Sequence, residues 1–156
     1  MNITAFRIVK RIQVAHAFNG EGARLYGGRG NAEGIPIIYC AGSRALAGLE
    51  VLVHLPSPLL QLDFMIIETQ FDSRFVQQIS IADLPPGWQN DQPVLATKNM
   101  GNQWAKEGNS LVLAVPSTII PEEPNYLINP EHPDFKAIQV GQPQEFSFDQ
   151  RLTGGF

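Results

Sequence analysis

The residues most suited to chemistry lie close together, between Gly20 and Leu55. Glycines are frequent in the first part of this stretch, around Arg24 and Arg29. Glycine lets backbone N–H groups approach a ligand closely, and a guanidinium binds anions through several hydrogen bonds, so such a loop can hold an anion. Its spacing matches neither a P-loop nor the glycine pattern of dinucleotide-binding folds. A flexible surface loop with solvated arginines is the simpler alternative, and composition leaves both open.

Glu50 is the second candidate. It lies at the edge of an apolar stripe on a predicted helix, one turn before His54. A carboxylate beside leucines is partly desolvated, which is unfavourable unless the charge has a partner. One interpretation is a helix-surface glutamate that pairs with His54 or an arginine. The other is a carboxylate held where positive charge develops during a reaction.

Two further polar residues have simple structural interpretations. Tyr39 alternates with apolar residues on a predicted strand, as a core tyrosine does. Ser117 follows a strand and a proline, which is typical of a turn, and its surroundings lack the Gly-x-Ser-x-Gly pattern of a nucleophile elbow. The histidines and the single cysteine do not have the spacing of metal ligands, so we expect no metal site: His16, His54, His132 and Cys40.

The elements that must position these residues follow from hydrophobic periodicity. Strands are predicted over residues 5–14, 35–41, 62–68, 75–81, 110–115 and 145–148. Ser43 can cap a helix over residues 44–55, with a core face of Ala45, Leu46, Leu49, Leu52 and Val53. A second helix is predicted over residues 94–107, and residues 16–34, 82–93 and 118–143 are predicted to be mainly loop. This order predicts a compact α+β domain, residues 1–156, with a mixed, mainly antiparallel sheet.

Composition limits the function classes. The formal net charge of −4 argues against direct nucleic-acid binding. A single cysteine excludes an internal disulfide and suits a reducing compartment. The chain has no N-terminal signal pattern and no apolar run long enough to cross a membrane. We therefore expect a cytoplasmic protein without membrane contacts.

Four segments together carry a family resemblance. GEGARLYGGRGN, GIPIIYCAGSRALAGLEVLVHL, LAVPSTIIPEEPNYLINPEHPDF and FDQRL resemble, in order, the RES domain, the toxin component of Xre–RES toxin–antitoxin pairs. The Arg, Glu and Ser that give the family its name match Arg29, Glu50 and Ser117, while Tyr39 and Arg7 match two further family positions. The family commonly has Gly-Gly-Arg-Trp-Asn where this chain has Gly30 in place of the tryptophan, which predicts a looser loop or a wider pocket.

The resemblance implies a fold like that of ADP-ribosyltransferases, with NAD+ as substrate rather than cofactor. Characterised RES proteins cleave the nicotinamide–ribose bond by hydrolysis or phosphorolysis, and some relatives attach ADP-ribose to a protein. Catalytic roles then fall to Glu50, Arg29 and Tyr39, and substrate binding to Arg7, Ser117 and Gly28. For Ser117 the implied hydrogen bond goes either to the nicotinamide amide or to Glu50.

The resemblance also implies a partner, an Xre-type helix-turn-helix antitoxin that forms a hetero-oligomer with the toxin and itself contacts DNA. The leading hypothesis is an NAD+-depleting toxin. A protein ADP-ribosyltransferase and a non-catalytic module that acts through its antitoxin are the alternatives.

Overall fold

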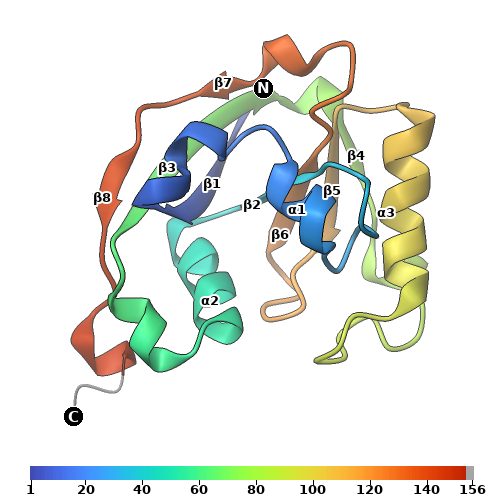
Figure 1. Cartoon of the computed structure of the whole chain (residues 1–156). Coiled ribbons are helices and arrows are strands. Elements are labelled where there is room, and N and C mark those ends of the chain that lie inside the picture. The colour runs from blue at the N-terminus through green and yellow to red at the C-terminus, as the bar shows by residue number, and fades with distance from the viewer. Residues whose placement is uncertain (154–156) are drawn as a thin grey trace.

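Strands β1 (Asn2–Lys10) and β3 (Phe64–Asp72) form the longest pair of the sheet, antiparallel along their full length. The computed structural model describes residues 1–153, and within them the strand order is β4-β5-β6-β2-β1-β3-β7, with β8 also on β3 (Figure 1). Every pairing is antiparallel except that of β4 with β5. The shorter strands are β2 (Ile38–Ala41), β4 (Val76–Gln78), β5 (Val112–Pro116), β6 (Pro124–Ile128), β7 (Gln139–Val140) and β8 (Gln144–Phe146).

In the described part of the chain, three α-helices pack on this sheet: α1 (Glu21–Tyr26), α2 (Arg44–His54) and α3 (Leu95–Glu107). Trp104 of α3 and Ala23 of α1 pack with Leu113 of β5 and Leu127 of β6. Leu46 of α2 packs instead with residues of β1. Figure 1 shows α2 and α3 well apart, at different ends of the sheet. Short 3-10 helices join the elements: Arg11–His16, Ser57–Gln61, Ser73–Phe75, Ile81–Asp83, Phe135–Ala137 and Gln150–Leu152.

Apolar residues pack on both faces of the sheet, because neighbouring residues on a strand point to opposite faces. Val112 and Ile128 belong to one apolar cluster, whereas Leu113 and Leu127, the adjacent residues, belong to another. The strands in the middle of the sheet are thus buried on both faces. This fixes the backbone of β2 and β6, on which site residues lie.

The predicted fold class, α+β with a mixed, mainly antiparallel sheet, is confirmed. The Ser43 cap is also confirmed, since its Oγ accepts a hydrogen bond from the backbone N–H of Leu46 at 3.0 Å. The predicted core face of α2 is partly wrong. Ala45 and Val53 are exposed, because the helix buries Leu46 against the sheet and turns Gly48 toward the rings of the C-terminal segment.

Several predicted boundaries are also wrong. The first strand ends at Lys10, before a 3-10 turn, and the strand predicted over residues 75–81 shortens to β4. Residues 16–34, predicted as loop, contain α1, and residues 118–143 contain β6 and β7. Proline and asparagine are poor strand formers, but β6 pairs with β5 on one side and β2 on the other, and those ladders override its local preference.

Candidate functional site

A cavity of about 840 Å³ lies between α2, the strands β1, β2 and β6, the loop after α1 and the connector before α3. Its volume falls in the range of small-molecule sites, roughly 300–1,000 Å³. Most of the residues singled out in the sequence line it: Arg7, Gly28, Arg29, Tyr39 and Glu50. Ser117, which the resemblance assigned to substrate binding, is fully buried and lies outside the cavity wall.

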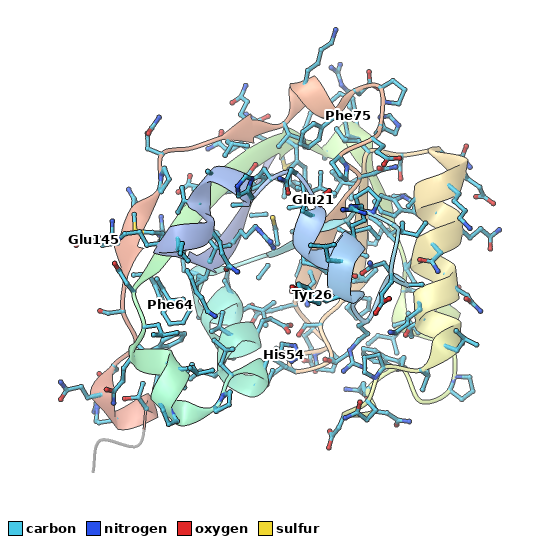
Figure 2. The ribbon with its side chains drawn as sticks, in the orientation of Figure 1. Glu21, Tyr26, His54, Phe64, Phe75 and Glu145 are labelled. Atoms are coloured by element: carbon cyan, nitrogen blue, oxygen red, sulfur yellow. The ribbon has the colours of Figure 1, made fainter. Side chains whose placement is uncertain are left out.

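Helix α2 presents one face to the cavity. Ala47, Glu50, Val51 and His54 line it, and their spacing of three or four residues places them on one side of a helix. Figure 2 marks His54 at the carboxyl end of this helix. The sequence periodicity that placed Glu50 at the edge of the apolar stripe therefore has a physical reason: that edge is the wall of the cavity.

The Glu50 carboxylate is held by two donors from other elements. Its Oε1 accepts hydrogen bonds from Ser117 Oγ at 3.1 Å and from Asn125 Nδ2 at 2.7 Å. None of the ion pairs within residues 1–153 includes Glu50, so the interpretation in which it pairs with His54 or an arginine is wrong. Within the described residues the carboxylate thus has hydrogen-bond donors but no ion-pair partner at the cavity wall.

Ser117 lies behind Glu50. Its Oγ accepts hydrogen bonds from the backbone N–H groups of Ile119 and Ile120 while donating to the carboxylate. Of the two hydrogen bonds considered for Ser117 from the sequence, the structure contains the one to Glu50. With its oxygen fully engaged and buried, Ser117 supports the carboxylate from the protein side.

Arg7 supplies positive charge to the cavity lining. Its Nη1 donates to the carbonyl oxygen of Tyr39 at 2.8 Å, while its Nε is buried and has no hydrogen-bond partner. Burial lowers the pKa of the guanidinium, but an arginine remains charged at neutral pH. No carboxylate within the described residues forms an ion pair with it. A cation without an anionic partner in a cavity is suited to an anionic ligand.

Tyr39 organises the glycine loop. Its hydroxyl donates to Asn31 Oδ1 at 2.5 Å and accepts from the N–H of Gly30 at 3.2 Å. Burial raises the pKa of this hydroxyl, so it stays protonated and continues to donate. Gly28 must lack a side chain, because a Cβ there would lie 2.8 Å from the Tyr39 oxygen. Asn31, which is fully buried, donates in turn to backbone carbonyls on both sides of the loop.

Arg29 connects the glycine loop to the connector before α3. Its Nη1 donates to the carbonyl oxygens of Trp88 at 3.1 Å and Asn90 at 2.8 Å. Arg24, the other arginine of the stretch, forms an ion pair with Glu21 and lies outside the cavity lining. The anion-binding capacity expected of the loop therefore rests on Arg29, together with Arg7 from β1.

Among the residues that the structure describes, no three His, Cys, Asp or Glu side chains cluster closely enough to hold a metal ion. Nor does any helix within residues 1–153 have the length and hydropathy needed to span a membrane.

Comparison with known proteins identifies the family. The model of the RES domain family matches residues 4–149. The chain belongs to the RES domain family. One curated relative, the Prs ADP-ribosylating toxin of Sphingobium sp. (strain YBL2), is 39% identical over 145 residues, which cover 91% of this chain and 90% of the relative. Toxin Res of Yersinia enterocolitica is 37% identical and covers 94% of this chain and 97% of its own length. The family and these relatives place the chain among the RES toxins.

A solved structure supports the fold. The crystal structure of the M. tuberculosis MbcT–MbcA toxin–antitoxin complex contains a chain that superposes with a TM-score of 0.70, covering 94% of this RES chain and 85% of the other. The two are 16% identical, so the likeness concerns the fold. It agrees with the mixed sheet and few helices described above.

The RES loop of this protein fits a residue without a side chain at position 30. A Cβ on Gly30 would lie 2.7 Å from Leu127 Cδ2, and the Gly30 carbonyl lies so close to α3 that a Cβ on Gly101 would be 1.6 Å from it. Asn102 Oδ1 also accepts a hydrogen bond from the N–H of Ala32 at 2.9 Å. The loop is therefore held against α3 by the close approach of the Gly30 carbonyl to Gly101 and by the hydrogen bond between Ala32 and Asn102.

Sequence reasoning assigned no role to the two asparagines that support this RES site. Asn31 holds Tyr39, and Asn125 holds Glu50. Asn31 carries a weak signal, because it lies in the glycine loop itself. For Asn125 the sequence gives no such signal, because the residue is far from Glu50 in sequence and lies in a segment predicted to be loop.

Proposed function

We propose that this RES toxin cleaves NAD+ at the bond between nicotinamide and ribose. The proposal rests on two charged side chains that line one cavity, the carboxylate of Glu50 and the guanidinium of Arg7. Both make hydrogen bonds, but neither has an ion-pair partner within the described residues. NAD+ presents complementary charges, a cationic nicotinamide ring joined to ribose and an anionic pyrophosphate. The Glu50 carboxylate suits the cationic nicotinamide and its ribose, and the Arg7 guanidinium suits the anionic pyrophosphate.

Glu50 has the central role in this reaction. Breaking the C–N bond leaves both bonding electrons on nicotinamide, which departs as a neutral molecule, and builds positive charge on the ribose ring. A carboxylate beside the ribose stabilises that charge more strongly in the transition state than in the bound substrate, and so lowers the barrier. Water or phosphate then bonds to C1′ of the ribose and loses a proton.

The remaining residues position the dinucleotide. Arg7 and Arg29 bind the pyrophosphate through charge-assisted hydrogen bonds, although Arg29 must share its guanidinium with the connector carbonyls. Tyr39 stacks near the nicotinamide or ribose and excludes water. Gly28 allows the substrate to approach the loop backbone. No further cofactor is needed for this chemistry.

A protein ADP-ribosyltransferase is the second candidate. The observation in its favour is the relative named Prs ADP-ribosylating toxin, which is 39% identical to this chain. The same cavity would serve, with a nucleophile from an acceptor protein in place of water or phosphate.

We further propose that the toxin acts in the cytoplasm and is neutralised by a cognate antitoxin of the Xre type. The support is the structural neighbour, which is a toxin–antitoxin complex, and the family itself. A purified toxin that binds operator DNA without its antitoxin would contradict the expected division of roles.

The direct experiment measures nicotinamide release from NAD+ by purified protein. Glu50→Gln keeps the size of the side chain but removes its charge, and we expect a loss of about 100-fold or more, as for other electrostatic stabilisers of a transition state. Glu122→Gln, a change at an exposed glutamate outside the cavity, is the matched control and should retain wild-type activity. Equal activity of wild type and Glu50→Gln would contradict the proposal. NAD+ labelled in its adenylate part distinguishes the candidates, since label on a protein band indicates transfer.

A further inference from the structure

We propose that Asn125 is a positioning residue that fixes the Glu50 carboxylate so that Oε2 is the oxygen offered to the substrate. The inference rests on the proposed function, because it concerns the same carboxylate. It concerns a residue outside the Arg, Glu, Ser and Tyr set that the family resemblance supplies.

The backbone of Asn125 is fixed on both sides. The residue lies on β6, where it pairs with Ala41 of β2 and Val115 of β5. Its side chain reaches the cavity wall and donates from Nδ2 to Glu50 Oε1 at 2.7 Å. This is the short distance expected of a hydrogen bond to a charged acceptor. A donor on a strand held from both sides has little freedom to follow a moving carboxylate, so it dictates where the carboxylate lies.

The side-chain amide of Asn125 makes its hydrogen bond to Glu50 alone. Its Oδ1 is buried and has no hydrogen-bond partner, which is unfavourable for a buried acceptor. Rotating the amide by 180° would place Oδ1 against Glu50 Oε1, two acceptors without a proton between them. In the observed orientation Nδ2 therefore donates to the Glu50 carboxylate, while Oδ1 has no hydrogen-bond partner.

Both donors converge on one carboxylate oxygen. Ser117 Oγ also donates to Oε1, at 3.1 Å, and among the described residues no hydrogen bond reaches Oε2. Two donors on one oxygen hold the rotation of the carboxyl group and leave the second oxygen with its lone pairs available. Since Glu50 lines the cavity, we assign Oε2 to the ribose, where the positive charge develops.

Asn129 shows the contrast within the same segment. It is buried just after β6, donates to the carbonyl oxygen of Ala105 and accepts from the N–H of Glu131. Both of its polar atoms are thus satisfied by backbone groups, and it lies outside the cavity lining. Asn129 has a structural role, which makes it the matched control for Asn125.

The test compares Asn125→Ala, Asn125→Asp and Asn129→Asp in steady-state nicotinamide release over a range of pH. Asn125→Ala should lower kcat about 10- to 100-fold, the usual effect of removing a residue that orients a reactive group, with a smaller change in KM. Asn125→Asp should be nearly inactive at high pH, where two carboxylates repel each other. It should regain activity as the pH falls, because the new carboxyl group can then donate its proton to Glu50.

A structural role predicts a different pattern. Asn129→Asp should lower Tm yet keep the shape of the wild-type pH profile for the folded fraction. If Asn125→Asp shows no recovery at low pH, or if Asn125→Ala keeps the wild-type kcat, the positioning role is overturned.

A second measurement separates this inference from the proposed function. In the protein without substrate, Glu50→Gln should shift the side-chain amide NMR signal of Asn125 and leave that of Asn129 in place. If the wild type does not cleave NAD+, the proposed function is overturned. The shift of the Asn125 amide signal still tests whether Asn125 positions Glu50, because it does not depend on activity. Unchanged signals of Asn125 would overturn the positioning role.

Discussion

Replacing Arg7 by Met should separate ligand binding from stability. Methionine keeps an unbranched apolar chain of similar length and removes the guanidinium. The substitution loses one hydrogen bond to the Tyr39 carbonyl, which contributes about 1 kcal/mol to stability. It also removes a buried Nε without a partner, whose burial costs about 1–3 kcal/mol. We therefore expect the free energy of unfolding to stay the same or rise by up to about 2 kcal/mol.

Ligand binding should change in the opposite direction. A charge-assisted hydrogen bond to a ligand anion contributes about 1.5–3 kcal/mol, so its loss should weaken binding of ADP-ribose about 10- to 150-fold. Isothermal titration calorimetry measures this affinity, and thermal unfolding measures stability on the same samples. Since about 1 kcal/mol corresponds to 2–4 °C for a chain of this size, the expected rise in Tm is measurable.

Arg11→Met provides the matched control. Arg11 follows β1, lies outside the cavity lining and forms ion pairs with Asp63 and Glu145 at the surface. The control should bind ADP-ribose like wild type. The reasoning is refuted if folded Arg7→Met also binds like wild type, or if it loses as much stability as a substitution in the apolar core.

The contact between loop and helix gives one further prediction, and the buried thiol gives two. Gly101→Ala places a Cβ 1.6 Å from the Gly30 carbonyl, so it should lower the free energy of unfolding by about 1–3 kcal/mol in urea unfolding and slow nicotinamide release. Gly22→Ala, whose Cβ has no neighbour within 4 Å, is the control for stability alone, since Gly22 lines the cavity, and it should not lower the free energy of unfolding. Burial raises the pKa of the Cys40 thiol to about 12, so native protein at pH 8 should resist maleimide labelling that the unfolded chain accepts rapidly. Because the folded state binds this proton more tightly than the unfolded chain, stability should fall as pH rises above about 9, and less so in Cys40→Ala.

The sequence predicted those parts of the fold in which local preference and tertiary environment agree. The helix that begins after Ser43 has a cap, an apolar stripe and a proline stop, and it forms within one residue of the predicted bounds. Strand β6 is the opposite case. Its Pro124 and Asn125 favour a loop, and only the ladders to β2 and β5, which bring distant segments together, make it a strand.

The site shows the same limit. Glu50 was recognisable because a charge among leucines is unusual in any sequence. Local periodicity could not reveal its two donors, because they lie 67 and 75 residues away in the sequence. The family resemblance identified Ser117 by its position in a motif. Only the structure shows that Glu50 lines the cavity while Ser117 lies behind it.

The place of β6 in the sheet has a consequence during synthesis. Arg7, Tyr39 and Glu50 leave the ribosome early, but the sheet stays divided between β2 and β5 until residues 124–128 have emerged to join them. Asn125 and Ser117, which hold the Glu50 carboxylate, also come from this late part of the chain. A nascent or prematurely terminated chain therefore has the charged residues of the cavity without the strand that assembles them. A chain that ends before residue 117 lacks both side chains that donate hydrogen bonds to Glu50.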